Sequence, residues 1–220
     1  TLSGATFQAV QCNVTKAHVQ ITCRTVEGVG VDHHWTVLIN GQLSNASSDT
    51  TSYHKPSIAG FDTPSVEPNG IETDGSSFVV LIGRNFGPPV PTNSNISAEY
   101  SNPNLTGLAG KLYSVSSCIV LDHEMIKCPT KMGIGYGHRW RVKVGFQWSN
   151  SSNTSTRYSL PAIHSLGFVH QSEGEKLYSL ESLSTQGGQL ILVNGSNFGP
   201  IDTRNDVTAA YSNENLTGLA

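Results

Sequence analysis

The chain carries an internal repeat that reaches its last residues. Residues 211–220 read YSNENLTGLA and residues 100–109 read YSNPNLTGLA, so the two segments differ at one position. A two-cysteine segment, residues 118–128, follows the internal copy, and its counterpart for residues 211–220 is found at residues 12–23. Internal repeats decide the architecture of a protein before any other signal. The sequence therefore predicts a chain that begins in the second half of one repeat and ends in the first half of another, as if copies joined head to tail.

The repeat is collinear along the whole chain, with a module of about 110 residues used twice. One module is complete at residues 55–160, and the other is split into a C-terminal half at residues 1–54 and an N-terminal half at residues 161–220. A fragment of a longer covalent tandem array would give the same pattern. The matched motifs are GRNFGP with GSNFGP, Cys23–Thr25 with Cys128–Thr130, the Gly-x-Gly loops before Trp35 and Trp140, Gln42 with Gln147, and Tyr53–Ile58 with Tyr158–Ile163.

Strand patterns dominate the sequence. Two equivalent segments, residues 140–146 and 35–40, alternate between apolar and polar side chains, which predicts half-buried strands. Short apolar runs at residues 78–82 and 189–193, bounded by Gly and Ser, predict core strands, and no stretch has a helical apolar period. The side chains expected to face a core are Trp140, Val142, Val144 and Phe146 in the first segment, and Trp35, Val37 and Ile39 in the second.

Composition limits the classes of partner. Charged residues make up 13% of the chain, the formal net charge is −3, and no basic run occurs, which argues against nucleic acid and anionic membranes as partners. The longest apolar run is too short to span a bilayer, so no membrane insertion by this segment is expected.

The four cysteines allow three pairings, and the repeat selects one disulfide per module. The pairs are Cys12 with Cys23 and Cys118 with Cys128, the second at the open end of a hairpin whose turn is Asp122–Glu124. Each disulfide closes a short loop and would stabilise the folded state by about 2–3 kcal/mol on the chain-entropy model. Disulfides imply an oxidising compartment, so an extracellular or cell-surface location is expected.

The order of these motifs resembles that of IPT/TIG domains. The motifs are Gly-x-Asn-Phe-Gly after a strand, a two-cysteine hairpin, a Gly-x-Gly loop before a Trp-initiated strand, and a closing Pro-x-Ile, and they occur twice. IPT/TIG domains are immunoglobulin-like modules of plexin-type receptors and of large extracellular repeat proteins of protists. The resemblance implies an all-β fold of tandem immunoglobulin-like sandwiches, in which one module is complete and two half modules complete each other. It implies binding or scaffolding rather than catalysis.

Asparagine sequons are abundant, which predicts N-linked glycans. The proline-rich segment at residues 88–92 predicts an extended stretch that could carry O-linked sugar on Thr92 or on modified Pro88, Pro89 and Pro91, although a plain rigid loop is the alternative. The eight N-x-[ST] sequons are Asn13, Asn45, Asn95, Asn104, Asn150, Asn153, Asn194 and Asn215.

Several apparent sites are not expected to carry chemistry. The cluster Asp32-His33-His34 resembles a metal site, but only His33 has a matching residue, His138, in the other module. The triplet at residues 122–124 is read as a solvated turn, and the glycine-rich loop at residues 133–137 precedes a strand rather than a phosphate-binding helix. No catalytic residues, metal or cofactor other than glycans are therefore expected.

The sequence favours a structural subunit of an extracellular, N-glycosylated linear fibril, with identical copies as partners head to tail. A half module that completes another would use main-chain pairing and a shared core. The alternative is a ligand-binding or adhesion segment of a receptor ectodomain with IPT/TIG repeats. A non-catalytic accessory domain of an enzyme is a third interpretation.

Overall fold

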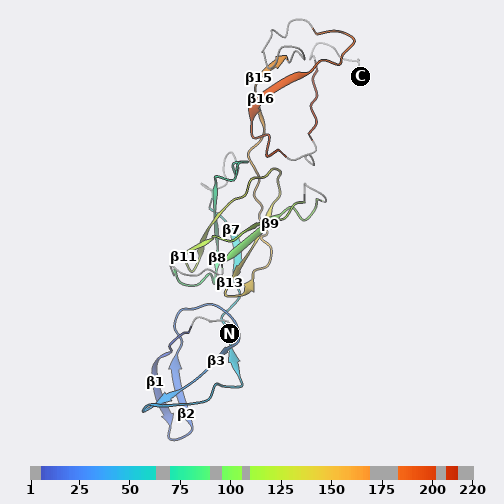
Figure 1. The fold of residues 1–220 in the computed structure, drawn as a ribbon. Helices are drawn as coiled ribbons and strands as arrows, with labels where there is room; N and C mark the ends of the chain where they lie inside the picture. The colour runs from blue at the N-terminus through green and yellow to red at the C-terminus, as the bar shows by residue number, and fades with distance from the viewer. Residues whose placement is uncertain are drawn as a thin grey trace.

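The computed structural model describes residues 6–62, 70–89, 96–105, 110–168, 183–201 and 207–212, and the regular secondary structure in these ranges is all β. The part of the chain described here has no helix long and apolar enough to cross a membrane. Figure 1 shows three parts in a row, with β1 to β6 at one end, β7 to β14 in the middle, and β15 with β16 at the other end.

Two four-stranded antiparallel sheets make up the middle part. The first has the strand order β11-β12-β8-β7 and the second has the order β10-β9-β13-β14. The strands of the first sheet are β7 (Ser57–Phe61), β8 (Phe78–Arg84), β11 (Ile119–Asp122) and β12 (Met125–Pro129). Those of the second are β9 (Ser97–Ser101), β10 (Tyr113–Val115), β13 (Arg139–Val144) and β14 (Gln147–Trp148).

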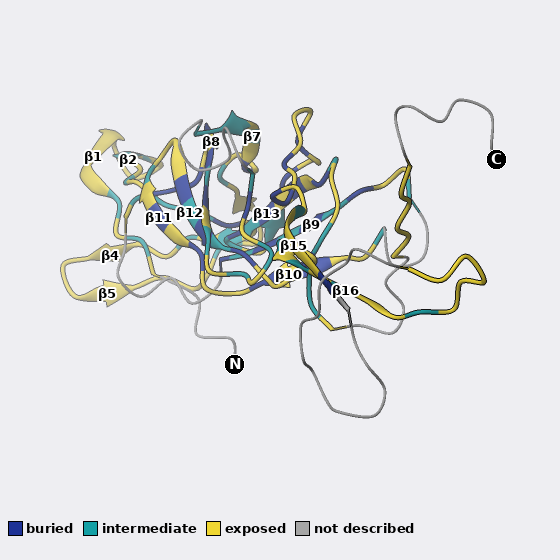
Figure 2. Cartoon of the chain, turned by 90° about the horizontal axis from the view of Figure 1, so that it is seen from above, coloured by how far each residue is buried: buried dark blue, intermediate teal, exposed yellow. Residues whose placement is uncertain are grey.

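Both sheets contribute to one hydrophobic core. On β8, Val79 and Leu81 are buried while Phe78 and Ile82 are exposed, so one face of the strand points inward. On β13, the expected inward residues Trp140, Val142 and Val144 are all buried. Alternation of this kind is what a strand with one face on a core requires. Figure 2 shows the buried segments on β8 and β12, in contrast to the exposed strands β1, β4 and β5.

Phe146 departs from the expected pattern. The sequence predicts that it faces the core with Trp140, but it is exposed, because β13 ends at Val144. Gly145 and Phe146 form the turn into β14 with φ values of 53° and 67°, in the left-handed region used by tight hairpin turns. The alternation therefore stops where the chain reverses.

Among the residues described in the two end parts, the strands form two-stranded sheets only. In the N-terminal part the pairs are β1-β2, β3-β6 and β4-β5, and in the C-terminal part the pair is β15-β16. Of the strand expected at residues 35–40, only β4 is regular. The bounds are β1 (Val10–Lys16), β2 (Gln20–Arg24), β3 (His33–His34), β4 (Leu38–Ile39), β5 (Gln42–Leu43), β6 (Thr50–Thr51), β15 (Ala162–Phe168) and β16 (Ile191–Ser196).

Both expected disulfides are present. Cys12 is bonded to Cys23 across β1 and β2, and Cys118 is bonded to Cys128 across the β11–β12 hairpin. The hairpin turns between Asp122 and Met125, as the sequence predicts. The two disulfides indicate an oxidising environment.

The N-terminal part is tied to the middle part through the turn after β13. The side-chain Nε2 of Gln147 donates hydrogen bonds to the carbonyl oxygens of Gly30 (3.1 Å) and Tyr53 (3.0 Å). A Cβ atom on Gly145 would lie 2.5 Å from the backbone nitrogen of Gly30, so only glycine fits there.

A buried histidine lies at the centre of the middle part. His138 is fully buried among the rings of Tyr100, Tyr113 and Tyr158, and its Nε2 donates a hydrogen bond to Ile134 O at 3.2 Å. This burial lowers the pKa of His138, because removal from water disfavours the charged imidazolium.

The lowered pKa of His138 predicts acid sensitivity of the middle part. The unfolded chain takes up the proton as pH falls through about 6.5, whereas the folded chain does not, so stability is lost below that pH. We expect the free energy of unfolding to fall between pH 7 and pH 5, by at most about 1.4 kcal/mol per pH unit from this group. Denaturant titrations at both pH values should give a smaller fall for His138→Phe. An equal fall in both proteins would assign the effect to other groups.

Candidate assembly interface

The N-terminal part has the local structure of the equivalent half of the middle part. In the middle part, Trp140 N–H donates to Ser152 Oγ (3.0 Å) and the indole Nε1 donates to Thr156 Oγ1 (2.9 Å). In the N-terminal part, Trp35 N–H donates to Ser47 Oγ (2.9 Å), and its indole Nε1 donates to a threonine hydroxyl, Thr51 Oγ1 (2.9 Å). Each residue is the counterpart in the repeat, so residues 35–51 have the same local hydrogen bonding as residues 140–156.

The C-terminal part likewise has the local structure of β7 and β8. Strands β15 and β16 pair in the same register as β7 and β8 and contain a bulge at the same place. The motif Gly-x-Asn-Phe-Gly follows both pairs, and its asparagine has a positive φ in each, 64° at Asn85 and 62° at Asn197. The Asn85 amide donates to Lys55 O and the Asn197 amide donates to Leu160 O, so each turn is held to the segment just before the first strand of its pair.

The two-stranded sheets β1-β2 and β15-β16 correspond in the repeat to the two halves of one four-stranded sheet of the middle part. In the complete sheet the order is β11-β12-β8-β7, and the pairing of β12 with β8 holds its halves together. Strands β1 and β2 are the counterparts of β11 and β12, and β16 and β15 are the counterparts of β8 and β7. Within the described ranges, β2 pairs only with β1 and β16 pairs only with β15. Each half thus has an open edge at the strand that would join the other half, and open edges recruit other strands.

Apolar faces lie beside these open edges. Val79 and Leu81 of β8 are fully buried, whereas their counterparts on β16, Ile191 and Val193, are 39% and 36% exposed. The inward face of β2 consists of Ile21 and Cys23, both half-buried. These facing positions carry no charge, so joining the two halves would bury apolar surface without desolvating an ion.

The second sheet is divided in the same way. In the middle part, β9 lies between β10 and β13. Its counterpart in the repeat is residues 208–212, in the C-terminal part, whereas the counterparts of β10 and β13 are in the N-terminal part. Val207 is 78% exposed where its counterpart Ile96 is 4% exposed. The counterpart of the strand that lies between β10 and β13 is therefore not in the N-terminal part.

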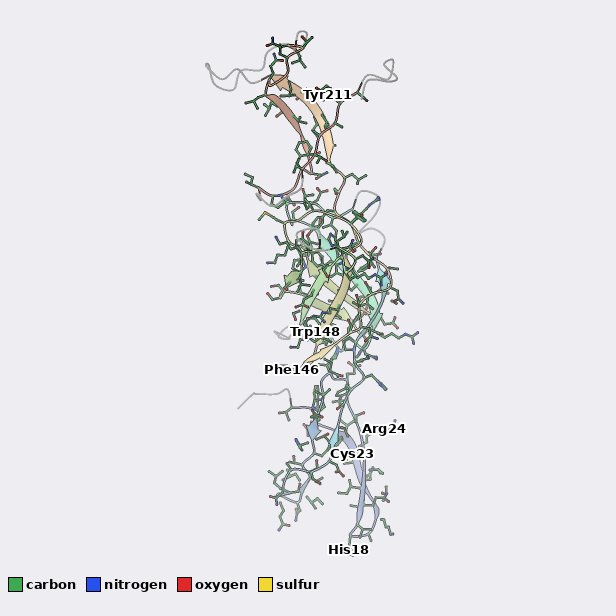
Figure 3. The ribbon with its side chains drawn as sticks, turned by 90° about the vertical axis from the view of Figure 1, so that its right-hand side faces the viewer. His18, Cys23, Arg24, Phe146, Trp148 and Tyr211 are labelled. Carbon is green, nitrogen blue, oxygen red and sulfur yellow. A yellow bond between two sulfur atoms is a disulfide. The ribbon has the colours of Figure 1, made fainter. Side chains whose placement is uncertain are left out.

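The two sets of open edges lie far apart in one chain. In Figure 1 the middle part separates β1 and β2 from β15 and β16. Figure 3 shows the same separation, with Cys23 and Arg24 of β2 at one end of the molecule and Tyr211 at the other. One chain in this arrangement cannot pair its own two edges.

The described sequons lie at the surface. Asn194 lies on β16 at the position equivalent to Ile82, on the face that points away from the core, so a glycan there does not obstruct the inward face. Asn95, Asn215, Pro91 and Thr92 lie outside the described residues, while Pro88 is half-buried and Pro89 is exposed. The sequon residues that are exposed are Asn13, Asn45, Asn104, Asn150 and Asn153, and Asn194 is half-buried.

The side chains of the apparent metal cluster have different neighbours. The ring of His33 packs against Phe7 and Tyr53. The Nδ1 atom of His34 lies 2.7 Å from the carbonyl oxygen of Ser47. No group of three potential metal ligands occurs in the part of the chain that the structure describes.

Comparison with known proteins gives no assignment. No protein-family model matches the chain, and neither a curated protein nor a solved structure matches it.

Proposed function

We propose that this chain is a structural subunit of an extracellular, N-glycosylated linear fibril. Copies join head to tail, and the C-terminal part of one copy completes an immunoglobulin-like β-sandwich with the N-terminal part of the next. The module divisions are residues 1–54, 55–160 and 161–220. The joined copies are separate chains or successive units of a longer chain, and the same interface serves both.

One observation carries this proposal: β1-β2 and β15-β16 form separate two-stranded sheets at opposite ends of the chain, whereas their counterparts in the repeat pair as the single four-stranded sheet β11-β12-β8-β7. By the register of β12 with β8, Ile21 would oppose Val193 and Cys23 would oppose Ile191 of the neighbouring copy. The new backbone ladder would pair both open edges, and the two apolar faces would form a core like that of the middle part.

The geometry of this contact favours an open polymer. The two surfaces differ and lie at opposite ends of the molecule, so the contact is heterologous, and such a contact gives a fibre when its rotation does not close a ring. The contact between the two halves of a β-sandwich would resemble an obligate protein–protein interface, and such interfaces bury about 2,000–5,000 Å². N-linked glycans on exposed sequons would limit lateral association of the finished fibre, because bulky hydrated groups block the remaining strand edges.

The proposal is tested with residues 1–220 secreted from a eukaryotic host that adds N-glycans. We expect negative-stain electron microscopy to show continuous fibrils with a regular axial repeat, and sedimentation to show concentration-dependent assembly. After reduction and denaturation, a species near 23.5 kDa plus glycans should remain, and enzymatic release of N-glycans should lower its mass. Monomers at every concentration, as short arms that do not assemble, would contradict the proposal and favour a receptor segment.

A further inference from the structure

The N-terminal part contains an incomplete aromatic cluster. In the middle part, the ring of Tyr100 stacks between Trp140, at a centroid distance of 4.1 Å, and Tyr113, at 4.9 Å. The counterparts of these two flanking rings are Trp35 and Phe7. Phe7 and Tyr113 each lie five residues before the first cysteine of their module. Among the described residues no ring stacks on Trp35 or Phe7, and both are only half-buried.

The remaining rings of the cluster are already in position. Phe7, His33 and Tyr53 have pairwise centroid distances of 5.3, 5.5 and 5.6 Å with interplanar angles of 89°, 62° and 77°. In the middle part, the rings of Tyr113, His138 and Tyr158 have corresponding distances of 5.6, 5.7 and 5.4 Å and angles of 88°, 58° and 82°.

The N-terminal part also repeats a hydrogen bond that orients the partner of the Tyr100 hydroxyl in the middle part. In the middle part, the backbone N–H of Lys131 donates to Tyr100 Oη (2.9 Å), and the Tyr158 hydroxyl donates to Lys131 O (2.7 Å). The Tyr100 hydroxyl therefore donates to Tyr158 Oη, at 2.8 Å. In the N-terminal part, the Tyr53 hydroxyl donates to Val26 O at 2.6 Å, so its oxygen is oriented to accept a hydrogen bond from a phenol.

The geometry points to a binding site for one tyrosine side chain, formed by Phe7, Trp35 and Tyr53, and filled by Tyr211 of a neighbouring copy. Tyr211 is the counterpart of Tyr100, and it is 100% exposed where Tyr100 is fully buried. Figure 3 shows it at the end of the molecule opposite to the N-terminal part.

This inference rests on the proposed joining of copies and adds the residue that specifies the joint. The register of residues 208–212 in the joint follows from that of their counterpart β9, in which Tyr100 is the Cα partner of both Trp140 and Tyr113. Tyr211 would in the same way lie opposite both Trp35 and Phe7. A tyrosine with two stacking partners and two hydrogen-bonding partners fixes one register and excludes slipped ones.

The test compares Tyr211→Ala with Tyr211→Phe in residues 1–220, and the critical concentration for assembly is measured by sedimentation. We expect the alanine variant to raise this concentration about 100-fold, because a buried aromatic side chain is lost. The phenylalanine variant keeps the stacking and should raise it less than about tenfold. Tyr211 is exposed in the single chain, so neither variant should change the unfolding curve of the monomer.

The outcomes separate the two proposals. If the unaltered protein forms fibrils and Tyr211→Ala forms them at the same concentration, the tyrosine site is wrong while head-to-tail assembly stands. If the unaltered protein forms none, head-to-tail assembly itself is wrong and the tyrosine site falls with it. A larger effect of phenylalanine than of alanine would also contradict the site, because stacking would then not matter.

Discussion

Replacement of Val193 by lysine is expected to abolish fibril formation while the monomer stays folded. Val193 is the counterpart of Leu81, which is fully buried beside Ile126 in the middle part. In a joined module the lysine would be buried without a partner, which costs about 3–5 kcal/mol. This cost corresponds to an increase of about 100-fold to 4,000-fold in the critical concentration. In the single chain Val193 is 36% exposed, so the lysine can reach water there.

The adjacent residue supplies a matched control. Leu192 corresponds to Val80, which lies between the two inward-facing residues of β8 and so points to the opposite face. Leu192→Lys adds the same charge one position away, and it should leave assembly within about tenfold of the unaltered protein. Sedimentation and electron microscopy of both variants at equal concentration make the comparison. Equal loss in both variants would indicate a general effect of charge, and the register of β16 against β2 would then be wrong.

The repeat in the sequence predicted the pairing of cysteines and most of the strand positions. The alternation around Trp140 identified three core residues correctly, because β13 lies in a complete sheet in which the pattern can be expressed. The similar pattern around Trp35 predicted the same strand. The structure has only Leu38–Ile39 there, since the counterpart of the neighbouring strand β9 lies at the other end of the chain. Whether a strand is buried depends on the strands that pack beside it, and the alternation of apolar residues within one segment does not show whether those neighbouring strands are present.

The aromatic site could not be found from periodicity. Phe7 precedes the first expected strand, and Tyr53 lies in an irregular segment, so neither belongs to an alternating pattern. Their spatial relation arises from the loop at Gly30 that brings them against His33. A signal for Phe7 was present, because an aromatic residue stands five positions before the first cysteine in both modules.

The same substitution at two equivalent tryptophans should separate folding from assembly. Trp140→Ala removes a fully buried ring from the middle core and should lower the free energy of unfolding by about 3–5 kcal/mol. Trp35→Ala removes a half-buried ring from the open N-terminal part, so the unfolding of the middle core should change little. Fibrils should nevertheless be lost in Trp35→Ala, because the ring that would stack on Tyr211 is missing.

Unfolding of both variants is best measured in a Val193→Lys background, in which only monomers are expected, so that assembly does not contribute to stability. Trp148→Ala is the control for loss of an indole. Trp148 lies on the outer face of β14 with Arg141 at 4.6 Å from its ring, and its removal should cost about 1 kcal/mol at most. If Trp35→Ala destabilised the monomer as much as Trp140→Ala, the N-terminal part would already be a completed fold. Its edges would then have no need of a neighbouring copy, and the physical basis for a fibril would be gone.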